Sequence, residues 1–341
     1  MINSLKLINF RKFKELSLDL ASKIVILTGA NGIGKTSVLE AIYLIATTKS
    51  HRTTEFTSLL TEGETYSVVE LKSEKNYKLI FNKNEKKAYV NDVFYPKFSE
   101  FIGQIPVVLF SPSDIELLQG SKSVRRRFLD LEISLLDKSY LRLIMAYKRL
   151  LKERNEILKV FSQEKALMLQ VVTNQMLEFI EKIYLKRLNF LNQLNQNLKD
   201  ICKDLQMETI HLKYLATYDI ENLEKSFSSK LKTDIATKTT NLGIHRDDFL
   251  IEMDGQNAKE FASEGQGRNA VLAIKLAVME FYKQANKDVL LLLDDVFSSM
   301  DQKRINHILE YIKNEPQTLI TTTSIFNIPD HLIRDAKIIK L

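Results

Sequence analysis

The chain has 341 residues, and its 49 Lys and Arg outnumber its 43 Asp and Glu for a formal net charge of +6. A hydrophobic content of 45% is ordinary for a globular protein, and the length suggests about two domains. Only 10 glycines and 5 prolines are present, which excludes collagen-like and low-complexity chains and disfavours a loop-rich all-β fold.

The single cysteine, Cys202, excludes an internal disulfide and favours a reducing compartment. The first residues lack the basic flank and apolar stretch of a signal peptide. No apolar run approaches the roughly 20 residues that a membrane helix needs. We therefore expect a cytoplasmic protein that has no membrane partner.

The first part of the chain alternates strand and helix signals. Residues 24–27, Ile-Val-Ile-Leu, predict a buried strand, and residues 36–47 predict a helix after a glycine-rich turn. Residues 65–95 combine Tyr, Val and Phe with an Asn-Asp turn signal, which predicts a β-meander. Residues 106–110 predict another strand, which ends before Pro112.

The middle of the chain reads as helical. Residues 113–205 contain no proline and one glycine, and their apolar residues recur in steps of three and four. A continuous helix over residues 164–205 would be roughly 60 Å long, which fits either a protruding arm or a long helix of an ordinary bundle. Residues 113–206 also carry 17 Lys and Arg against 12 Asp and Glu, nearly all of the positive excess.

Strand signals return after residue 207. Residues 210–214, 289–293 and 319–323 predict strands, and residues 270–285 predict a helix. We therefore predict an α/β domain in two parts, residues 1–112 and 207–341, interrupted by an all-helical lobe over residues 113–206.

A glycine-rich loop follows the first buried strand. Residues 29–36 read G-A-N-G-I-G-K-T and match the P-loop pattern G-x-x-x-x-G-K-[ST] in its strand–loop–helix context. Backbone N–H groups of such a loop and the helix N-terminus bind phosphates, while Lys35 reaches the β- and γ-phosphates and Thr36 ligates Mg²⁺. The predicted nucleotide-binding residues are Gly29, Ala30, Asn31, Gly32, Ile33, Gly34, Lys35, Thr36 and Ser37.

The apolar strand of residues 289–293 ends in two acidic residues. Asp294 emerges at the carboxyl end of the strand, where open α/β sheets bind ligands, and is predicted to hold Mg²⁺ together with Thr36. Asp295 follows, where a general base could orient the attacking water. A strand-ending acidic turn would look the same, but the P-loop favours a catalytic site with Lys35, Asp294 and Asp295.

Two short segments resemble motifs of the ABC ATPases. Residues 262–266, A-S-E-G-Q, precede a helix and resemble the signature motif, usually L-S-G-G-Q, and residues 298–301, S-S-M-D, resemble the D-loop. In that family the signature faces the γ-phosphate bound by the other subunit. The resemblance implies an ATP-dependent homodimer with catalytic Ser263, and with Ser263, Gly265 and Gln266 binding nucleotide.

The rest of the chain resembles the RecF family of bacterial recombination mediators, which are SMC-like ABC ATPases. The segments that carry this resemblance are residues 9–11 (N-F-R), 49–53 (K-S-H-R-T), 109–114 (L-F-S-P-S-D), 125–130 (R-R-R-F-L-D), 152–155 (K-E-R-N) and 245–248 (H-R-D-D). They cover nearly the whole length and imply an α/β fold, an ABC-type P-loop ATPase head (SMC-like) with an inserted all-helical lobe.

The same resemblance implies a function. It implies ATP and Mg²⁺ as cofactors, a dimer that closes on DNA at gaps and single-strand/duplex junctions, and slow hydrolysis that DNA stimulates. The implied partners are RecR and RecO, and the implied location is the bacterial cytoplasm, at the nucleoid.

The chain departs from the ABC pattern at several positions. Asp295 stands where Glu is usual, which predicts slow turnover, and the signature has Ala262 and Glu264 in place of Leu and Gly. No Gln stands near residues 110–113, where a Q-loop would fall, and no His follows the last strand. Thr322 could hydrogen-bond a phosphate there but could not take up a proton as His does.

Five arginines are candidates for DNA contacts: Arg52, Arg125, Arg126, Arg127 and Arg246. Each has a structural alternative. Arg52 could lie in a solvated turn or near the phosphates, Arg246 could form an ion pair, and three consecutive arginines spread around a helix and cannot all face one phosphate path.

Two other functions compete with a DNA-binding ATPase. A small-molecule phosphotransferase would also use a P-loop, although no acceptor-site motif is present. A non-catalytic assembly protein that uses ATP only to dimerise would tolerate the short Asp295 side chain.

Overall fold

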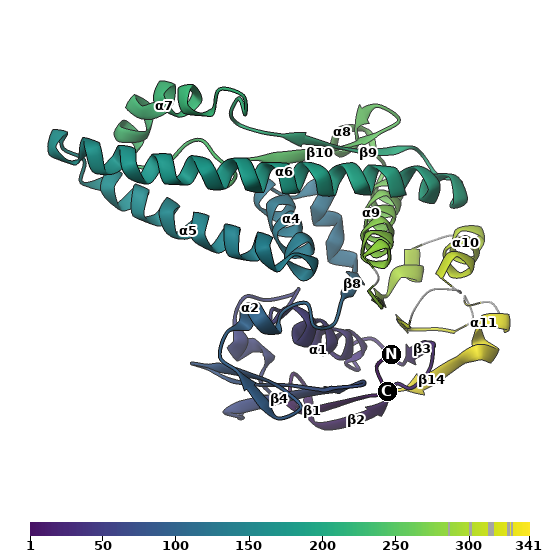
Figure 1. Ribbon diagram of the computed structural model, residues 1–341. Helices are drawn as coiled ribbons and strands as arrows, with labels where there is room; N and C mark the ends of the chain where they lie inside the picture. Colours follow the sequence, from purple (N-terminus) through teal and green to yellow (C-terminus); the bar gives the residue numbers. More distant parts are fainter. Residues whose placement is uncertain (286, 300–301, 313–316, 326–327, 329) are drawn as a thin grey trace. The chain divides into compact units, whose positions relative to one another are not determined.

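The structure, a computed structural model, describes residues 1–285, 287–299, 302–312, 317–325, 328 and 330–341 (Figure 1). These residues form two compact units. The head comprises Met1–Ile115, Asp200–Glu208 and Ser263–Leu341, and the lobe comprises Glu116–Lys199 and Thr209–Ala262. Among the helices described, none has the length and apolar content to cross a lipid bilayer.

A five-stranded sheet in which all neighbouring strands are parallel forms one layer of the head, in the order β14-β3-β13-β12-β8. All residues of β8, β12 and β13 are buried, as is typical of strands in a parallel sheet. The carboxyl ends of β3, β12 and β13 therefore meet at one edge. The strands are β3 Ile24–Thr28, β8 Val107–Phe110, β12 Leu290–Asp294, β13 Thr318–Thr322 and β14 Ala336–Lys340.

A six-stranded antiparallel sheet, ordered β2-β1-β4-β5-β6-β7, forms a second layer. Its last four strands confirm the meander predicted over residues 65–95. Alternate residues of β4 and β5 are buried, because one face of the sheet packs on the core. The strands are β1 Ser4–Phe10, β2 Phe13–Asp19, β4 Tyr66–Lys72, β5 Asn76–Asn82, β6 Lys86–Val90 and β7 Val93–Tyr95.

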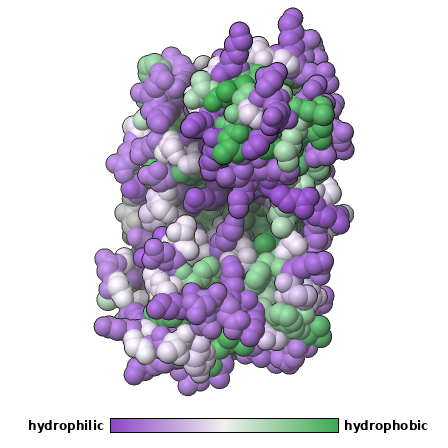
Figure 2. All heavy atoms as spheres, turned by 90° about the vertical axis from the view of Figure 1, so that its left-hand side faces the viewer, coloured by the Kyte–Doolittle hydropathy of each residue, from purple (hydrophilic) through white to green (hydrophobic). Residues whose placement is uncertain are grey.

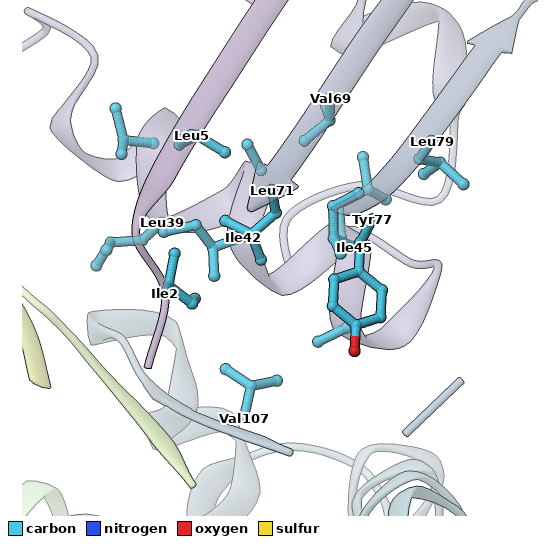
Figure 3. Packing of buried hydrophobic residues seen from close by; sticks show 14 of the residues in the cluster. Ile2, Leu5, Leu39, Ile42, Ile45, Val69, Leu71, Tyr77, Leu79 and Val107 are labelled. Atoms are coloured by element: carbon cyan, nitrogen blue, oxygen red, sulfur yellow. The ribbon is translucent and has the colours of Figure 1, made fainter. Parts of the chain in front are cut away.

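Helix α1, Lys35–Thr47, lies between the two sheets and contacts strands of both. Figure 3 shows Leu39, Ile42 and Ile45 of this helix among side chains of β1, β4 and β5, with Val107 of β8 nearby. Burial on both sides fixes the axis of α1. Its first residues, Lys35 and Thr36, are thereby held at the carboxyl edge of the parallel sheet.

Short helices and one long helix complete the head. Helix α9 packs on β8, an edge strand of the parallel sheet. The elements are η1 Phe56–Leu59, α2 Phe98–Phe101, η2 Pro112–Ile115, α9 Glu264–Gln284, η4 Val296–Ser299, α10 Gln302–Ile312 and α11 Asp330–Asp335.

The lobe is built on two antiparallel helices, α5 and α6. Asp137 precedes α5 and pairs with Lys186, whereas Arg154, near the other end of α5, hydrogen-bonds Thr173. Buried apolar residues recur along α6 from Leu169 onward, so it is a bundle helix and not a protruding arm. The helices are α3 Glu116–Gln119, α4 Lys122–Leu136, α5 Lys138–Lys159, η3 Gln163–Lys165, α6 Ala166–Asp204, α7 Leu223–Thr237 and α8 Ala258–Phe261.

The lobe extends beyond the predicted boundary at residue 207 and is not only helical. Strands β9 Ile210–Leu215, β10 Asp248–Met253 and β11 Gln256–Asn257 form an antiparallel sheet within it. Phe249 of β10 packs against Phe128 of α4, and the Asn195 side chain of α6 bonds to the backbone of β9. These tertiary contacts place residues 209–262 in the lobe, and no local sequence pattern predicts the contacts.

One end of the lobe has a groove of about 540 Å³ between α5, α6 and α7. Apolar side chains there reach the surface, and Figure 2 shows such patches among mainly hydrophilic residues in its upper part. The exposed apolar residues of this end include Val160, Leu167, Met168, Val171 and Leu231.

Candidate nucleotide-binding site

A pocket of about 740 Å³ opens at the carboxyl edge of the parallel sheet. It is lined by the P-loop, the ends of β12 and β13, the turn between β1 and β2, and side chains between residues 52 and 62. Of the predicted loop residues, those that line it are Asn31, Gly32, Gly34, Lys35, Thr36 and Ser37.

The backbone conformation of the P-loop depends on Gly34 and on hydrogen bonds from Lys35. Gly34 caps α1 at φ 107°, and a Cβ there would stand 2.4 Å from Cζ of Phe13, so only glycine fits. The Lys35 ammonium donates to the carbonyls of Gly29 (2.7 Å) and Ala30 (2.9 Å). Gly29 and Ala30, with Ile33 turning back on Ala30, shape the loop around this cation instead of lining the pocket.

A carboxylate and two hydroxyls meet at the base of the pocket. The Oδ1 atom of Asp294 accepts hydrogen bonds from Thr36 Oγ1 (2.9 Å) and Thr321 Oγ1 (2.7 Å), and Asp294 is only 4% exposed. Thr36 and Asp294 thus present oxygens to one point, which suits Mg²⁺. The residues that the structure describes include no cluster of three or more His, Cys, Asp or Glu. A Mg²⁺ ion held by Thr36 and Asp294 would take its other ligands from phosphate oxygens and water.

Thr321 has a role that the sequence analysis missed. Its hydroxyl also accepts a hydrogen bond from the backbone N–H of Asp295 (2.9 Å), which has a left-handed φ of 48° and lines the pocket. Thr322, predicted as the phosphate neighbour, donates instead to the carbonyl of Ser324. Side chains alternate along a strand, so Thr321 and Thr323 line the pocket and Thr322 does not.

Two arginines form one wall of the pocket, and a fully buried glutamate behind it pairs with both. Arg11 makes a bidentate pair with Glu40 of α1 (2.9 and 2.7 Å), and Arg52 approaches the same carboxylate at 3.7 Å. Burial raises the pKa of Glu40, but hydrogen bonds from Arg11 and Ser50 outweigh it and leave the pKa lowered. Both arginines line the pocket, so Arg52 lies by the predicted phosphate site. Arg11 lies there too, although the sequence analysis included it only in a segment that carries the family resemblance.

The signature residues lie at the start of α9. Ser263 caps this helix in a capping box with Gln266, and the Gln266 amide donates to Glu208 (2.8 Å). Ser263 and Gly265 are exposed, and neither they nor Gln266 are among the residues that line the pocket. Within one chain, the P-loop and Asp294 therefore line the same pocket, whereas Ser263 and Gly265 of the signature are exposed and do not line it. In the predicted D-loop, Met300, Asp301 and the side chains of Ser298 and Ser299 lie outside the described residues.

The structure places the candidate DNA-binding arginines of the lobe in three environments: buried, half-buried and exposed. Arg125 is buried in a bidentate pair with Asp248 (2.6 and 3.0 Å), so its prediction as a DNA contact is corrected to a structural role. Arg126 is half-buried and donates to the carbonyl of Asp247 (2.8 Å). Arg127 and Arg246 are exposed.

Comparison with known proteins places the chain in a family. Residues 4–327 match the model of a family described as an AAA domain. The DNA replication and repair protein RecF of Acholeplasma laidlawii is 38% identical over 328 residues, which cover 94% of this chain and 93% of that protein. RecF of Geobacillus thermodenitrificans is 35% identical over 361 residues, covering 100% and 97%.

Solved structures of RecF and of an Smc head domain are similar to this chain. One described as the recombination mediator protein RecF-ATP in the RecFOR pathway superimposes with a TM-score of 0.88 at 28% identity, covering 96% of this chain and 93% of the other. An Smc head domain from Pyrococcus furiosus has a TM-score of 0.57 at 15% identity, a likeness of fold alone, covering 99% and 92%. The predicted SMC-like ABC head is confirmed, and the chain belongs to the RecF family of DNA replication and repair proteins.

Proposed function

We propose that the chain is an ATP-switched DNA-binding protein of recombinational repair, which dimerises on ATP and hydrolyses it slowly. The observation that carries the proposal is a divided site. Lys35, Asp294 and Asp295 share one pocket, while the Ser263 cap faces outward on the same unit. A second copy that brought its α9 N-terminus to the γ-phosphate would complete the site.

The residues of the pocket have distinct roles in this proposal. The P-loop N–H groups and Lys35 bind the phosphates, and Lys35 exchanges its carbonyl partners for phosphate oxygens. Thr36 and Asp294 hold Mg²⁺, which neutralises phosphate charge. Asp295 orients the attacking water, and its short side chain limits the rate until bound DNA closes the dimer.

The DNA and protein partners follow from the family. Curated RecF relatives are named as DNA replication and repair proteins, and solved RecF structures are described within the RecFOR pathway. We infer that the dimer acts in the cytoplasm at gaps and single-strand/duplex junctions of nucleoid DNA. We also infer that it works there with RecO and RecR to load the recombinase.

Light scattering of the protein with and without ATP, Mg²⁺ and gapped duplex tests the divided site. Wild type should be monomeric alone and dimeric with ATP. Ser263→Arg should bind ATP yet stay monomeric, because a bulky cation would occupy the phosphate-facing cap. Lys35→Ala should lose nucleotide binding altogether.

Ser229→Arg, at an exposed serine of α7, is the matched control and should dimerise like wild type. A Ser263→Arg protein that dimerises and hydrolyses ATP normally would refute the divided site. Dimers that form with ATP but show no turnover at saturating DNA would instead indicate the non-catalytic assembly protein.

A further inference from the structure

We propose that the exposed face of helix α5 is the surface through which the lobe contacts the phosphate backbone of DNA. The inference rests on the DNA-binding function proposed above and gives that function a surface. The residues that define the α5 face are Arg142, Met145, Arg149 and Lys152.

The positive charge of the chain is concentrated on this helix. Within Lys138–Lys159 there are seven Lys and Arg and two Glu, a net charge of +5, whereas the whole chain carries +6. The longer α6, Ala166–Asp204, has five Lys and Arg against four Asp and Glu. Within the middle segment α5 contributes the largest excess, followed by α4, which has four Lys and Arg against two Asp and Glu.

The helix presents this charge in one direction. Tyr140, Ile144 and Tyr147 are buried on the face that packs into the lobe. Arg142, Arg149 and Lys152 are exposed and recur at steps of seven and three residues, so they share the opposite face. Arg142 and Arg149 are about 10.5 Å apart along the axis, a span over which a nucleic-acid strand offers several phosphates.

Several carboxylates of the lobe pair with other cations. Asp248 pairs with Arg125, Asp234 with Arg154, and Asp130 with Arg187 and Lys148. On α5 itself, Glu156 pairs with Lys159. Among the residues that the structure describes, no carboxylate lies within ion-pair distance of Arg142, Arg149 or Lys152. Lys152 interacts electrostatically with Glu156, and the charge of Arg142 and Arg149 is left to the solvent or to a polyanion.

Arg127 extends the α5 face onto the neighbouring helix. It stands one turn before Asp130 in α4, and Asp130 pairs with Lys148 of α5 at 3.2 Å. Residues three apart lie on one side of a helix, so the exposed Arg127 lies beside the α5 cations. Of the three consecutive arginines, this one faces outward, whereas Arg125 is buried.

Nucleic acid fits this surface better than a membrane does. A helix that lies in a membrane interface inserts a broad apolar face, but the apolar face of α5 is used to pack the lobe. The exposed face offers guanidinium groups, which bind phosphate oxygens bidentately, and one apolar side chain, Met145, which is 57% exposed. Such a line of cations can position a phosphate backbone, and contacts to phosphate carry no sequence information.

The test replaces Arg142, Arg149 and Lys152 together with Gln in the full-length chain. Binding to a fluorescent gapped duplex is measured by anisotropy with ATP and Mg²⁺ over a salt series. Loss of three phosphate contacts should lower the slope of log affinity against log salt by about 2.7 and weaken binding roughly tenfold or more. Circular dichroism and ATP binding should be unchanged, since none of the three lines the nucleotide pocket.

The matched control replaces three exposed lysines of α7, Lys225, Lys230 and Lys232, with Gln, which removes the same charge from the same unit. It should keep the wild-type slope. If both triple variants bind DNA alike, the α5 surface is wrong and the proposed function stands. If wild type with ATP binds no DNA, the proposed function fails too. Retained DNA binding with lost binding to phosphatidylglycerol vesicles would assign α5 to membranes and overturn the proposal.

Discussion

At the residue scale, the pocket is organised around one oxygen of Asp294. Two hydroxyls, from Thr36 and Thr321, donate to it, and Thr321 also holds the backbone N–H of Asp295. Asp295 occupies a left-handed conformation that non-glycine residues adopt infrequently. The Thr321 hydroxyl thus couples the predicted metal ligand to the predicted water-orienting residue.

Thr321→Val should lower ATP turnover while ATP still binds. Valine has nearly the same shape, but it leaves the Asp295 N–H unpaired, which costs about 1–3 kcal/mol, and it frees Asp295 to move from its position. Steady-state ATPase rates and nucleotide titration would measure this. The control is Thr322→Val, because the Thr322 hydroxyl bonds only to Ser324. Equal losses of ATP turnover in both variants would contradict the coupling of Asp294 to Asp295 through Thr321.

At the scale of elements, buried polar networks hold the lobe together. Tyr147 of α5 donates to Nδ1 of His245 (2.6 Å), and Nε2 of the same ring faces the carbonyl of Thr240 (3.0 Å). His245 belongs to the loop before β10, so its neutral ring joins the helix pair to the small sheet. Burial lowers the pKa of this His to about 4.

The lobe should therefore lose stability as the pH falls from 6.5 towards 4. In this window the unfolded chain takes up a proton at His245, whose ordinary pKa is 6.5, while the folded ring stays neutral. The loss from this group should not exceed about 3 kcal/mol. Urea unfolding at several pH values would measure it. His245→Gln should flatten that pH dependence and the exposed His211→Gln should not, so an unchanged profile in His245→Gln would contradict this account.

At the scale of the whole molecule, nucleotide and signature sites are two surfaces of one head. In the proposed dimer, the start of α9, which does not line the pocket of its own chain, would meet the nucleotide bound by the other copy. ATP bound between two copies would link their association to hydrolysis, so the lifetime of the dimer would be set by Asp295.

Asp295→Asn should bind ATP and accumulate as a dimer. The amide keeps the size of the side chain but cannot act as a base, so hydrolysis should fall roughly a hundredfold or more. Size-exclusion chromatography with ATP and Mg²⁺ would show a dimer that persists for longer than that of wild type. Asp288→Asn, at an exposed site, should behave as wild type. A rapidly dissociating Asp295→Asn dimer would argue that hydrolysis does not control release.

Much of the fold and the centre of the site could be predicted because they depend on neighbours in sequence. The P-loop needs glycines at set spacings, and the strand before Asp294 needs only an apolar run. The roles of Arg11 and Thr321 could not be predicted in this way. Each acts through a partner far along the chain, Glu40 for Arg11 and Asp294 for Thr321.

Sequence alone predicts an α/β head, the P-loop, the acidic end of β12 and the concentration of positive charge in the middle segment. Periodicity and composition suffice for these, since each is a property of contiguous residues. Only the tertiary structure decided that residues 209–262 join the lobe, that Arg125 is buried, and that the basic excess faces outward on α5. Those outcomes depend on which carboxylates and apolar faces meet after folding, and local sequence does not specify such pairings.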